Sequence, residues 1–175
     1  MKKFNKKAAS FILYCCTIII ISSFWHIEVR AHIANGWVLS NPSNVKYNIS
    51  TFVGPYTSET ITYVEKWETY CSEIGISSAS SNENIYFYGD FNVDNGTYAI
   101  CLHHNDNYHV ITYYYAFTKA TASERQETIV HEVGHALGLA HCQSDKESIS
   151  VMRATGFNNK AYPLSDDIAG ISAIY

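Results

Sequence analysis

Residues 131–141 carry three histidines and a glutamate in the order His-Glu-x-x-His-x-x-Gly-x-x-His, a pattern that constrains the chain more than any other feature. Two histidines four positions apart on a helix lie on one face, so His131 and His135 can direct ring nitrogens at one cation. Gly138 allows the backbone to leave the helix in a left-handed conformation, which brings His141 back as a third ligand. The pattern therefore predicts a metal site and an active-site helix that ends at Gly138.

Three neutral imidazoles with an open fourth position are typical of a catalytic rather than a structural zinc site. Glu132 lies off the axis of the two helical histidines, where its carboxylate can reach a zinc-bound water without binding the ion. We expect one catalytic Zn²⁺ held by His131, His135 and His141, attack by a zinc-bound water, and Glu132 as the general base. A structural site would normally close the fourth position and would gain nothing from Glu132.

The full pattern resembles the signature of the metzincin zinc peptidases, which continues into a methionine turn. Met152 fits that turn, in which the resemblance implies an apolar floor beneath the zinc ligands. Residues 165–171 read Ser-Asp-Asp-Ile-Ala-Gly-Ile, which is similar to the closing helix of the matrixin branch. Ala154 stands two residues beyond Met152, where astacins and serralysins usually carry a tyrosine. The resemblance therefore points to matrixin-like enzymes.

This resemblance implies an α+β, zincin-like fold. Its expected parts are a twisted, mixed five-stranded sheet, three helices, and a small C-terminal subdomain that holds the methionine turn and the final helix. The implied activity is a zinc-dependent endopeptidase, a monomer that acts on proteins or peptides. Matrixins commonly follow the methionine turn with a Pro-x-Tyr wall of the specificity pocket, whereas residues 154–157 here read Ala-Thr-Gly-Phe. A preference for a bulky apolar residue after the scissile bond is thus expected by analogy alone.

The N-terminal stretch predicts a secretory signal peptide, residues 1–31. Four lysines precede an apolar run at residues 11–21, and Val29 and Ala31 occupy the positions that signal peptidase inspects. We expect cleavage after Ala31 and a secreted, extracellular catalytic domain of residues 32–175; an uncleaved membrane anchor is the alternative. This division leaves no room for an inhibitory pro-segment, so the sequence does not indicate how activity is controlled.

The expected mature chain is acidic. Residues 32–175 keep 7 of the 12 Lys and Arg and 15 of the 16 Asp and Glu, which gives a formal net charge of −8. Such a charge argues against nucleic acid or an anionic membrane as a partner of the mature form. It does not identify the substrate.

Three of the five cysteines lie in the expected mature chain: Cys71, Cys101 and Cys142. An oxidising compartment favours one disulfide, and the sequence allows three pairings. We favour Cys71 with Cys101, because each lies far from the metal motif in sequence. Cys142 adjoins His141 and is expected to be a small buried side chain, with a thiol near the zinc as the alternative.

Residue periodicity predicts the order of the elements. Alternation at Val45, Tyr47 and Ile49 predicts a half-buried first strand, and apolar residues at helical spacing predict an amphipathic helix over 57–72. Branched and aromatic residues predict strands at 85–88, 98–101 and 110–115. Capping patterns predict that the active-site helix begins after Thr121 or Ser123. Ser165 is expected to cap the last helix.

Two further stretches resemble metal sites without matching their full patterns. Asp90, Asn92 and Asp94 resemble a calcium loop without its closing glutamate. His103, His104 and His109 do not reproduce the usual His and Asp pattern of a second, structural zinc in matrixins. The alternative functions are a non-catalytic secreted zinc-binding module and a membrane-anchored form of the same peptidase.

Overall fold

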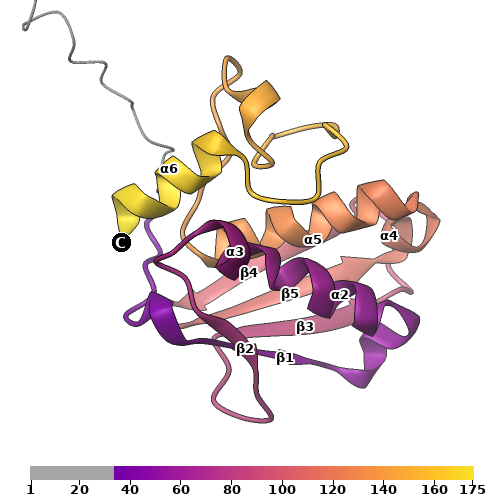
Figure 1. Cartoon of the computed structure of the whole chain (residues 1–175). Helices are drawn as coiled ribbons and strands as arrows, with labels where there is room; N and C mark the ends of the chain where they lie inside the picture. Colours follow the sequence, from indigo (N-terminus) through magenta and orange to yellow (C-terminus); the bar gives the residue numbers. More distant parts are fainter. Residues whose placement is uncertain (1–33) are drawn as a thin grey trace, which may run out of the picture. The chain divides into compact units, whose positions relative to one another are not determined.

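The computed structural model describes residues 34–175 (Figure 1). The expected signal peptide and its cleavage site lie outside the described residues. Within residues 34–175, no helix is both long and apolar enough to cross a bilayer.

A mixed five-stranded sheet forms one layer, as expected, with the strand order β2-β1-β3-β5-β4. Strands β2, β1, β3 and β5 run parallel to their neighbours, and only the β4–β5 pair is antiparallel. The antiparallel strand β4 therefore lies at the edge of the sheet. The bounds are β1 Val45–Ile49, β2 Ile76–Ser78, β3 Ile85–Asp90, β4 Ala99–Asn105 and β5 Tyr108–Tyr114.

Helices cover one face of this sheet (Figure 1). The chain forms α2 (Thr57–Val64), α3 (Lys66–Tyr70), α4 (Tyr115–Lys119), α5 (Ala122–Ala136) and α6 (Ser165–Ile174). Short 3₁₀ turns lie at Pro42–Asn44, Thr51–Tyr56 and Glu147–Ile149. The three helices of eight or more residues, α2, α5 and α6, correspond to the three that were expected.

The core lies between the sheet and helices α2, α3 and α5. The inward positions of β1, β3 and β5 are buried, in keeping with the alternation of side chains along a strand. Trp67 of α3 is fully buried and donates its indole N–H to the carbonyl of Val130 in α5 at 3.1 Å. This bond ties α3 to the middle of the active-site helix.

Helix α5 begins as the sequence predicts. Of the two overlapping capping signals, the structure uses Thr121, whose hydroxyl accepts the N–H of Glu124 while the Glu124 carboxylate accepts the N–H of Thr121. The expected end at Gly138 is two residues too late, because the last helical residue is Ala136. Gly138 has φ +99°, so it makes the left-handed turn just beyond the helix.

Helix α6 is capped differently from the prediction. Ser165 is the first helical residue and makes no side-chain cap; instead the Asp167 carboxylate accepts the N–H of Leu164 at 2.8 Å. A carboxylate near a helix N-terminus also interacts favourably with the helix dipole. Asp167 therefore both caps α6 and stabilises it electrostatically.

Three local features differ from the sequence prediction. The helix expected over 57–72 is interrupted at Glu65, which separates α2 from α3. Strand β2 was not predicted, since a three-residue strand is too short for a periodic pattern. Tyr115 was assigned to a strand, but it begins α4.

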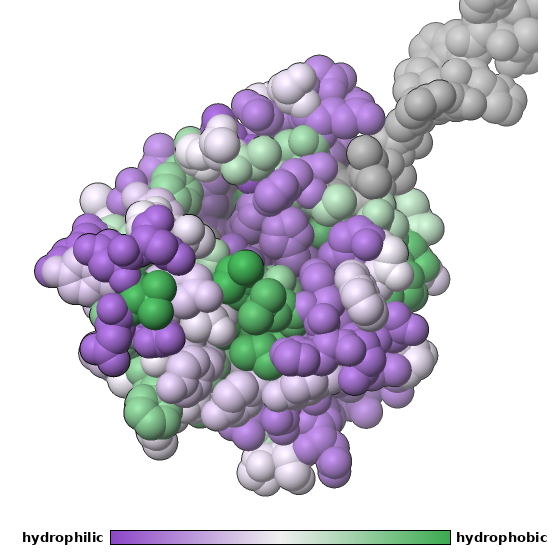
Figure 2. All heavy atoms as spheres, turned by 180° about the vertical axis from the view of Figure 1, so that it is seen from behind, coloured by the Kyte–Doolittle hydropathy of each residue, from purple (hydrophilic) through white to green (hydrophobic). Residues whose placement is uncertain are grey.

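The view from behind shows apolar side chains gathered near the centre of a mostly polar face (Figure 2). Edge strand β4 alternates between the two sides of the sheet: Ala99 and Cys101 are buried or half-buried, while Ile100 and Leu102 are exposed. One side of β4 thus faces helix α5, and its free edge remains beside the site described next.

Candidate active site

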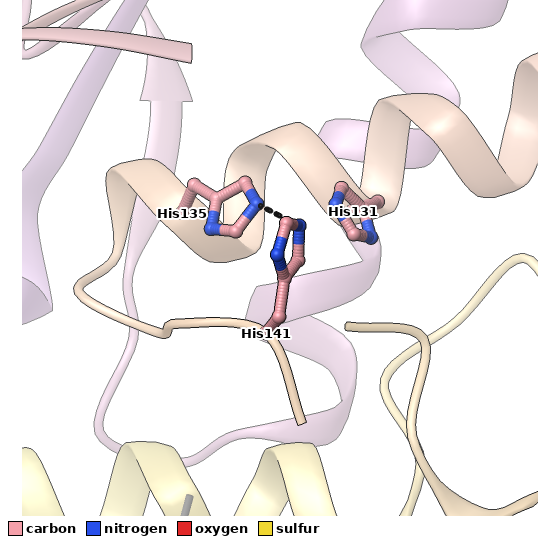
Figure 3. Close-up of side chains that lie close together, drawn as sticks. All are labelled: His131, His135 and His141. Atoms are coloured by element: carbon pink, nitrogen blue, oxygen red, sulfur yellow. Dashed lines mark hydrogen bonds between the residues drawn. The ribbon is translucent and has the colours of Figure 1, made fainter. Parts of the chain in front are cut away.

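The three histidines of the 131–141 pattern converge in the structure. His131 and His135 project from one face of α5, and His141 reaches them from the segment beyond the Gly138 turn (Figure 3). One ligand atom from each residue lies within 4.8 Å of the others. Among residues 34–175, these three, here called the histidine triad, are the group of side chains able to hold a metal ion.

Backbone carbonyls fix the orientation of the two helical rings. Nδ1 of His131 bonds to the carbonyl of Val151, and Nδ1 of His135 bonds to the carbonyl of Leu139, both at 2.8 Å. A carbonyl oxygen only accepts, so each Nδ1 carries the proton and each Nε2 presents a lone pair. These are the tautomers that metal binding through Nε2 requires.

The spacing of His135 and His141 fits two ligands of one tetrahedral zinc ion. Nε2 of His135 and Nε2 of His141 are 3.3 Å apart. Zinc–nitrogen bonds of about 2.0–2.1 Å place two tetrahedral ligands roughly 3.3–3.4 Å from each other. Burial, followed by the neighbouring His131, also lowers the pKa of His135 to about 3, which keeps this ring neutral. The triad therefore fits the zinc ion predicted from the sequence.

Met152 packs against α5 at Gly134, near the C-terminal end of the helix that carries two of the three histidines. Its side chain is fully buried, and a Cβ placed on Gly134 would come within 2.4 Å of the Met152 sulfur. The carbonyl of Met152 accepts the N–H of Cys142 at 2.7 Å, which ties the turn to the segment that carries His141. Only glycine at position 134 permits this close packing between the helix and the turn.

Gly138 has a comparable steric role. Besides its positive φ, a Cβ at this position would lie 2.7 Å from the carbonyl oxygen of Trp37. The sequence predicted the backbone conformation of Gly138 but not this approach of the N-terminal segment.

Glu132 is buried beside the triad, with 7% of its surface exposed. Burial raises the pKa of its carboxyl to about 8, and a hydrogen bond from the backbone of Cys101 opposes that rise. Because a neighbouring positive charge lowers a carboxyl pKa, a bound cation would shift Glu132 back towards its ionised form. A carboxyl group in this setting can exchange a proton near neutral pH.

A cavity of about 370 Å³ opens over the triad and Glu132, and Ala99, Ile100 and Cys101 of β4 line one side of it. Asn35 and His103 also line it, and the sequence did not indicate either residue as part of the site. The cavity therefore lies between the active-site helix and the edge of the sheet.

Asn35 connects the N-terminal segment to the turn that follows α5. Its side-chain amide donates to the carbonyls of His135 at 2.9 Å and Leu139 at 3.3 Å, and its backbone N–H donates to Gly138 at 2.9 Å. No periodicity or motif marks Asn35, since its role depends on contacts about 100 residues away in the sequence.

His103 reaches the cavity from β4. Its ring stacks on Trp37 with centroids 5.5 Å apart, and its Nδ1 lies 2.9 Å from Nδ1 of the buried His109. The three histidines of this region thus do not gather as a second triad: His103 and His109 pair with each other, and His104 contacts Tyr108.

A model of the family described as Matrixin matches residues 64–175, which is more than half of the chain. The chain belongs to the matrixin family. It is therefore a zinc metalloendopeptidase that acts on protein or peptide substrates, as the histidine pattern and the methionine turn had indicated. The match spans α5, the triad, Met152 and α6.

One solved structure shows the same fold for this matrixin. A structure titled "Structure of myroilysin" superposes with a TM-score of 0.60 at 13% sequence identity, covering 82% of this chain and 97% of that one. A second, titled "Crystal structure of myroilysin", gives a TM-score of 0.45 at 19% identity, covering 61% of this chain and 48% of that one. The comparison with curated protein sequences gives no significant match.

The predicted disulfide between Cys71 and Cys101 is wrong. Cys71, Cys101 and Cys142 are all free thiols in the structure. Cys71 is buried where α3 ends, whereas Cys101 lies on edge strand β4 and lines the cavity next to Glu132. Distance in sequence from the metal motif therefore misled the prediction, because the sheet brings Cys101 to the site.

Proposed function

We propose that this matrixin is secreted and that it cleaves peptide bonds with Glu132 as general base, beside a zinc ion held by the histidine triad. The observation that supports this most directly is the burial of Glu132 in the wall of the cavity that the triad lines. When bound, zinc would supply Lewis acidity, which polarises a carbonyl and brings the pKa of water down to about 7.

The protein's own residues would position the reacting groups. The carbonyls of Val151 and Leu139 hold His131 and His135 in the ligand tautomer, and Met152 supports the helix from below. Glu132 would accept a proton from water and pass it to the leaving amine, a role that suits a carboxyl with a raised pKa. The packing of α5 fixes this arrangement before a substrate arrives.

The position of edge strand β4 favours an extended peptide as the substrate. One edge of β4 has no partner strand among the described residues, and its residues Ala99 to Cys101 line the cavity. A peptide can add to such an edge through main-chain hydrogen bonds. It would then cross the cavity with one of its carbonyls near the triad.

The variant Glu132→Gln tests the proposal. The amide keeps the size of the side chain but cannot accept the proton, so we expect zinc content to stay the same and peptide cleavage to fall by about 10²–10⁴-fold. Cleavage by the wild-type protein should also stop when a chelator removes the metal. If Glu132→Gln cleaved peptides at the wild-type rate, Glu132 would not be the base. If the wild-type protein bound zinc but cleaved no peptide, the non-catalytic module would be the correct interpretation.

Secretion needs a separate experiment, because it rests on the N-terminal sequence alone. N-terminal sequencing of protein recovered from the culture medium should give His32 as the first residue. Recovery of the protein only from membranes, with residues 1–31 still attached, would favour the anchored form instead.

A further inference from the structure

A second cavity, of about 470 Å³, adjoins the site. It shares Ala99, His131 and Glu132 with the first cavity, so the two meet at the reacting groups. Its far wall is the loop of residues 153–157, directly after Met152. A substrate crossing the triad would place the side chain next to the scissile bond in this second cavity.

Hydrogen bonds anchor the chain directly after the loop of residues 153–157. The buried carboxylate of Glu127 accepts the backbone N–H groups of Asn158 at 2.9 Å and Lys160 at 3.1 Å, and the Asn158 side chain donates to the carbonyl of Ser150 at 2.8 Å. Phe157 makes an edge-on contact with Tyr98, ring centroids 5.4 Å apart. The two aromatic rings give the cavity an apolar rim, and the loop gives it a defined shape.

Arg153 places a guanidinium group in this wall with much of its hydrogen-bonding capacity unused. Its Nη1 donates to the carbonyl of Phe157 at 3.1 Å, and its Nη2 lies 3.5 Å from the Glu147 carboxylate. Its Nε is buried and has no hydrogen-bond partner within residues 34–175. A guanidinium has five N–H groups, and the contacts of Nη1 and Nη2 use only part of them, so a ligand oxygen can accept from the remaining Nη hydrogens.

We propose that Arg153 determines specificity in this second cavity, where it selects a substrate side chain that ends in a carboxylate or amide oxygen. This inference rests on the proposed function. The apolar rim formed by Tyr98 and Phe157 suits the methylene stem of glutamate or glutamine, and Arg153 meets the oxygen at its end. The bulky apolar preference implied by the matrixin resemblance is then replaced by a long side chain with a polar end. Glu147 at 3.5 Å competes for the same charge, so it weakens the preference for an acidic side chain.

Two substitutions with opposite effects test Arg153. Matched peptides that differ only in Glu, Gln or Leu next to the scissile bond would be cleaved by the zinc-loaded full chain, with kcat/KM measured for each. Wild type should favour Glu and Gln over Leu by about 10-fold, the effect expected of one charge-assisted hydrogen bond. Arg153→Met should abolish or reverse that ratio, and Glu147→Gln should raise the Glu/Leu ratio several-fold because it removes the competing charge.

The control is Lys146→Gln, which removes a charge next to Glu147 from a residue that does not line the cavity. It should leave the Glu/Leu ratio unchanged within about 2-fold. A purely structural role for Arg153 would lower cleavage of all peptides equally, and Glu147→Gln would not change their ratio. Such a result, or a wild-type preference for Leu, would overturn the inference while leaving the peptidase assignment intact. If the wild-type protein cleaved none of the peptides in a full library, the proposed function itself would fail, and this inference with it.

Discussion

The buried carboxylate of Asp167 accepts the backbone N–H of Val151 at 2.9 Å. The carbonyl of the same Val151 accepts from Nδ1 of His131, so the backbone of one residue joins helix α6 to a member of the triad. Asp167 also bonds to the hydroxyl of Ser150 and the N–H of Leu164. The final helix therefore acts on the site from a distance, because it fixes the turn that orients a candidate ligand.

The variant Asp167→Asn should weaken both the fold and the metal site. The amide has one acceptor oxygen in place of two and is uncharged, so we expect a loss of about 2–4 kcal/mol in the free energy of unfolding. Zinc affinity should fall by about 10–100-fold, the usual effect of removing a group that orients a ligand. Chemical denaturation and competition with a chromogenic chelator would measure the two quantities.

Ser165→Ala provides the matched control for Asp167→Asn. Ser165 is exposed and its side chain makes no cap, so stability should change by less than about 0.5 kcal/mol. Equal losses in the two variants would contradict the role given to Asp167.

The variant Gly134→Ala tests the packing of Met152 under α5. Alanine normally stabilises a helix relative to glycine by about 1 kcal/mol. Here the new Cβ would lie 2.4 Å from the Met152 sulfur and 2.9 Å from the ring of Trp67, so we expect destabilisation of about 1–3 kcal/mol instead. Thermal or denaturant unfolding would show whether Gly134→Ala lowers or raises the free energy of unfolding.

A double-mutant cycle identifies the cause of that loss. With Met152→Ala already present the sulfur is gone, so Gly134→Ala should cost clearly less than it does in the wild-type background. Identical costs in both backgrounds would show that the two residues do not interact.

The sequence predicted those parts of the molecule whose determinants are local. Thr121 and Glu124 cap α5 as expected, and Gly138 adopts the left-handed conformation, because both depend on neighbours within a few residues. The family resemblance supplied the five-stranded sheet and the position of Met152. The triad could be predicted because the geometry of one helix and one turn brings its members together.

The residues that were missed owe their place to long-range contacts. Asn35 and His103 line the cavity because the N-terminal segment and strand β4 both approach the end of α5. Cys101 is far from the metal motif in sequence but close to it in space. The register of β4 decides this, because it directs Cys101 towards Glu132. The cap on α6 was assigned to Ser165 although Asp167, two residues later, could reach back to Leu164.

The fully buried His109 should make the fold sensitive to acid. Burial, followed by the nearby His103, lowers its pKa from 6.5 to about 4, and hydrogen bonding with Asp106 opposes the shift only in part. The unfolded chain therefore takes up this proton first as the pH falls. The contribution of neutral His109 to the free energy of unfolding is fully present above pH 6.5. It is lost as the pH falls from 6.5 through about 4, and the full loss in the free energy of unfolding is about 3 kcal/mol.

His109→Gln removes this dependence. We expect the wild-type protein to lose about 3 kcal/mol more than the variant between pH 7 and pH 4, measured by denaturant unfolding. Both proteins should be measured with a chelator present, so that release of zinc from the triad does not contribute. Parallel stability curves for the two proteins would contradict the shifted pKa.

Three imidazoles should hold one zinc ion and leave a position open beside Glu132. Zinc-edge X-ray absorption spectroscopy of the protein loaded with one equivalent of zinc measures this coordination. We expect a four-coordinate ion with three imidazole nitrogens and one further light donor at about 2.0–2.1 Å. A sulfur ligand at about 2.3 Å, from Cys101 or Cys142, would contradict it.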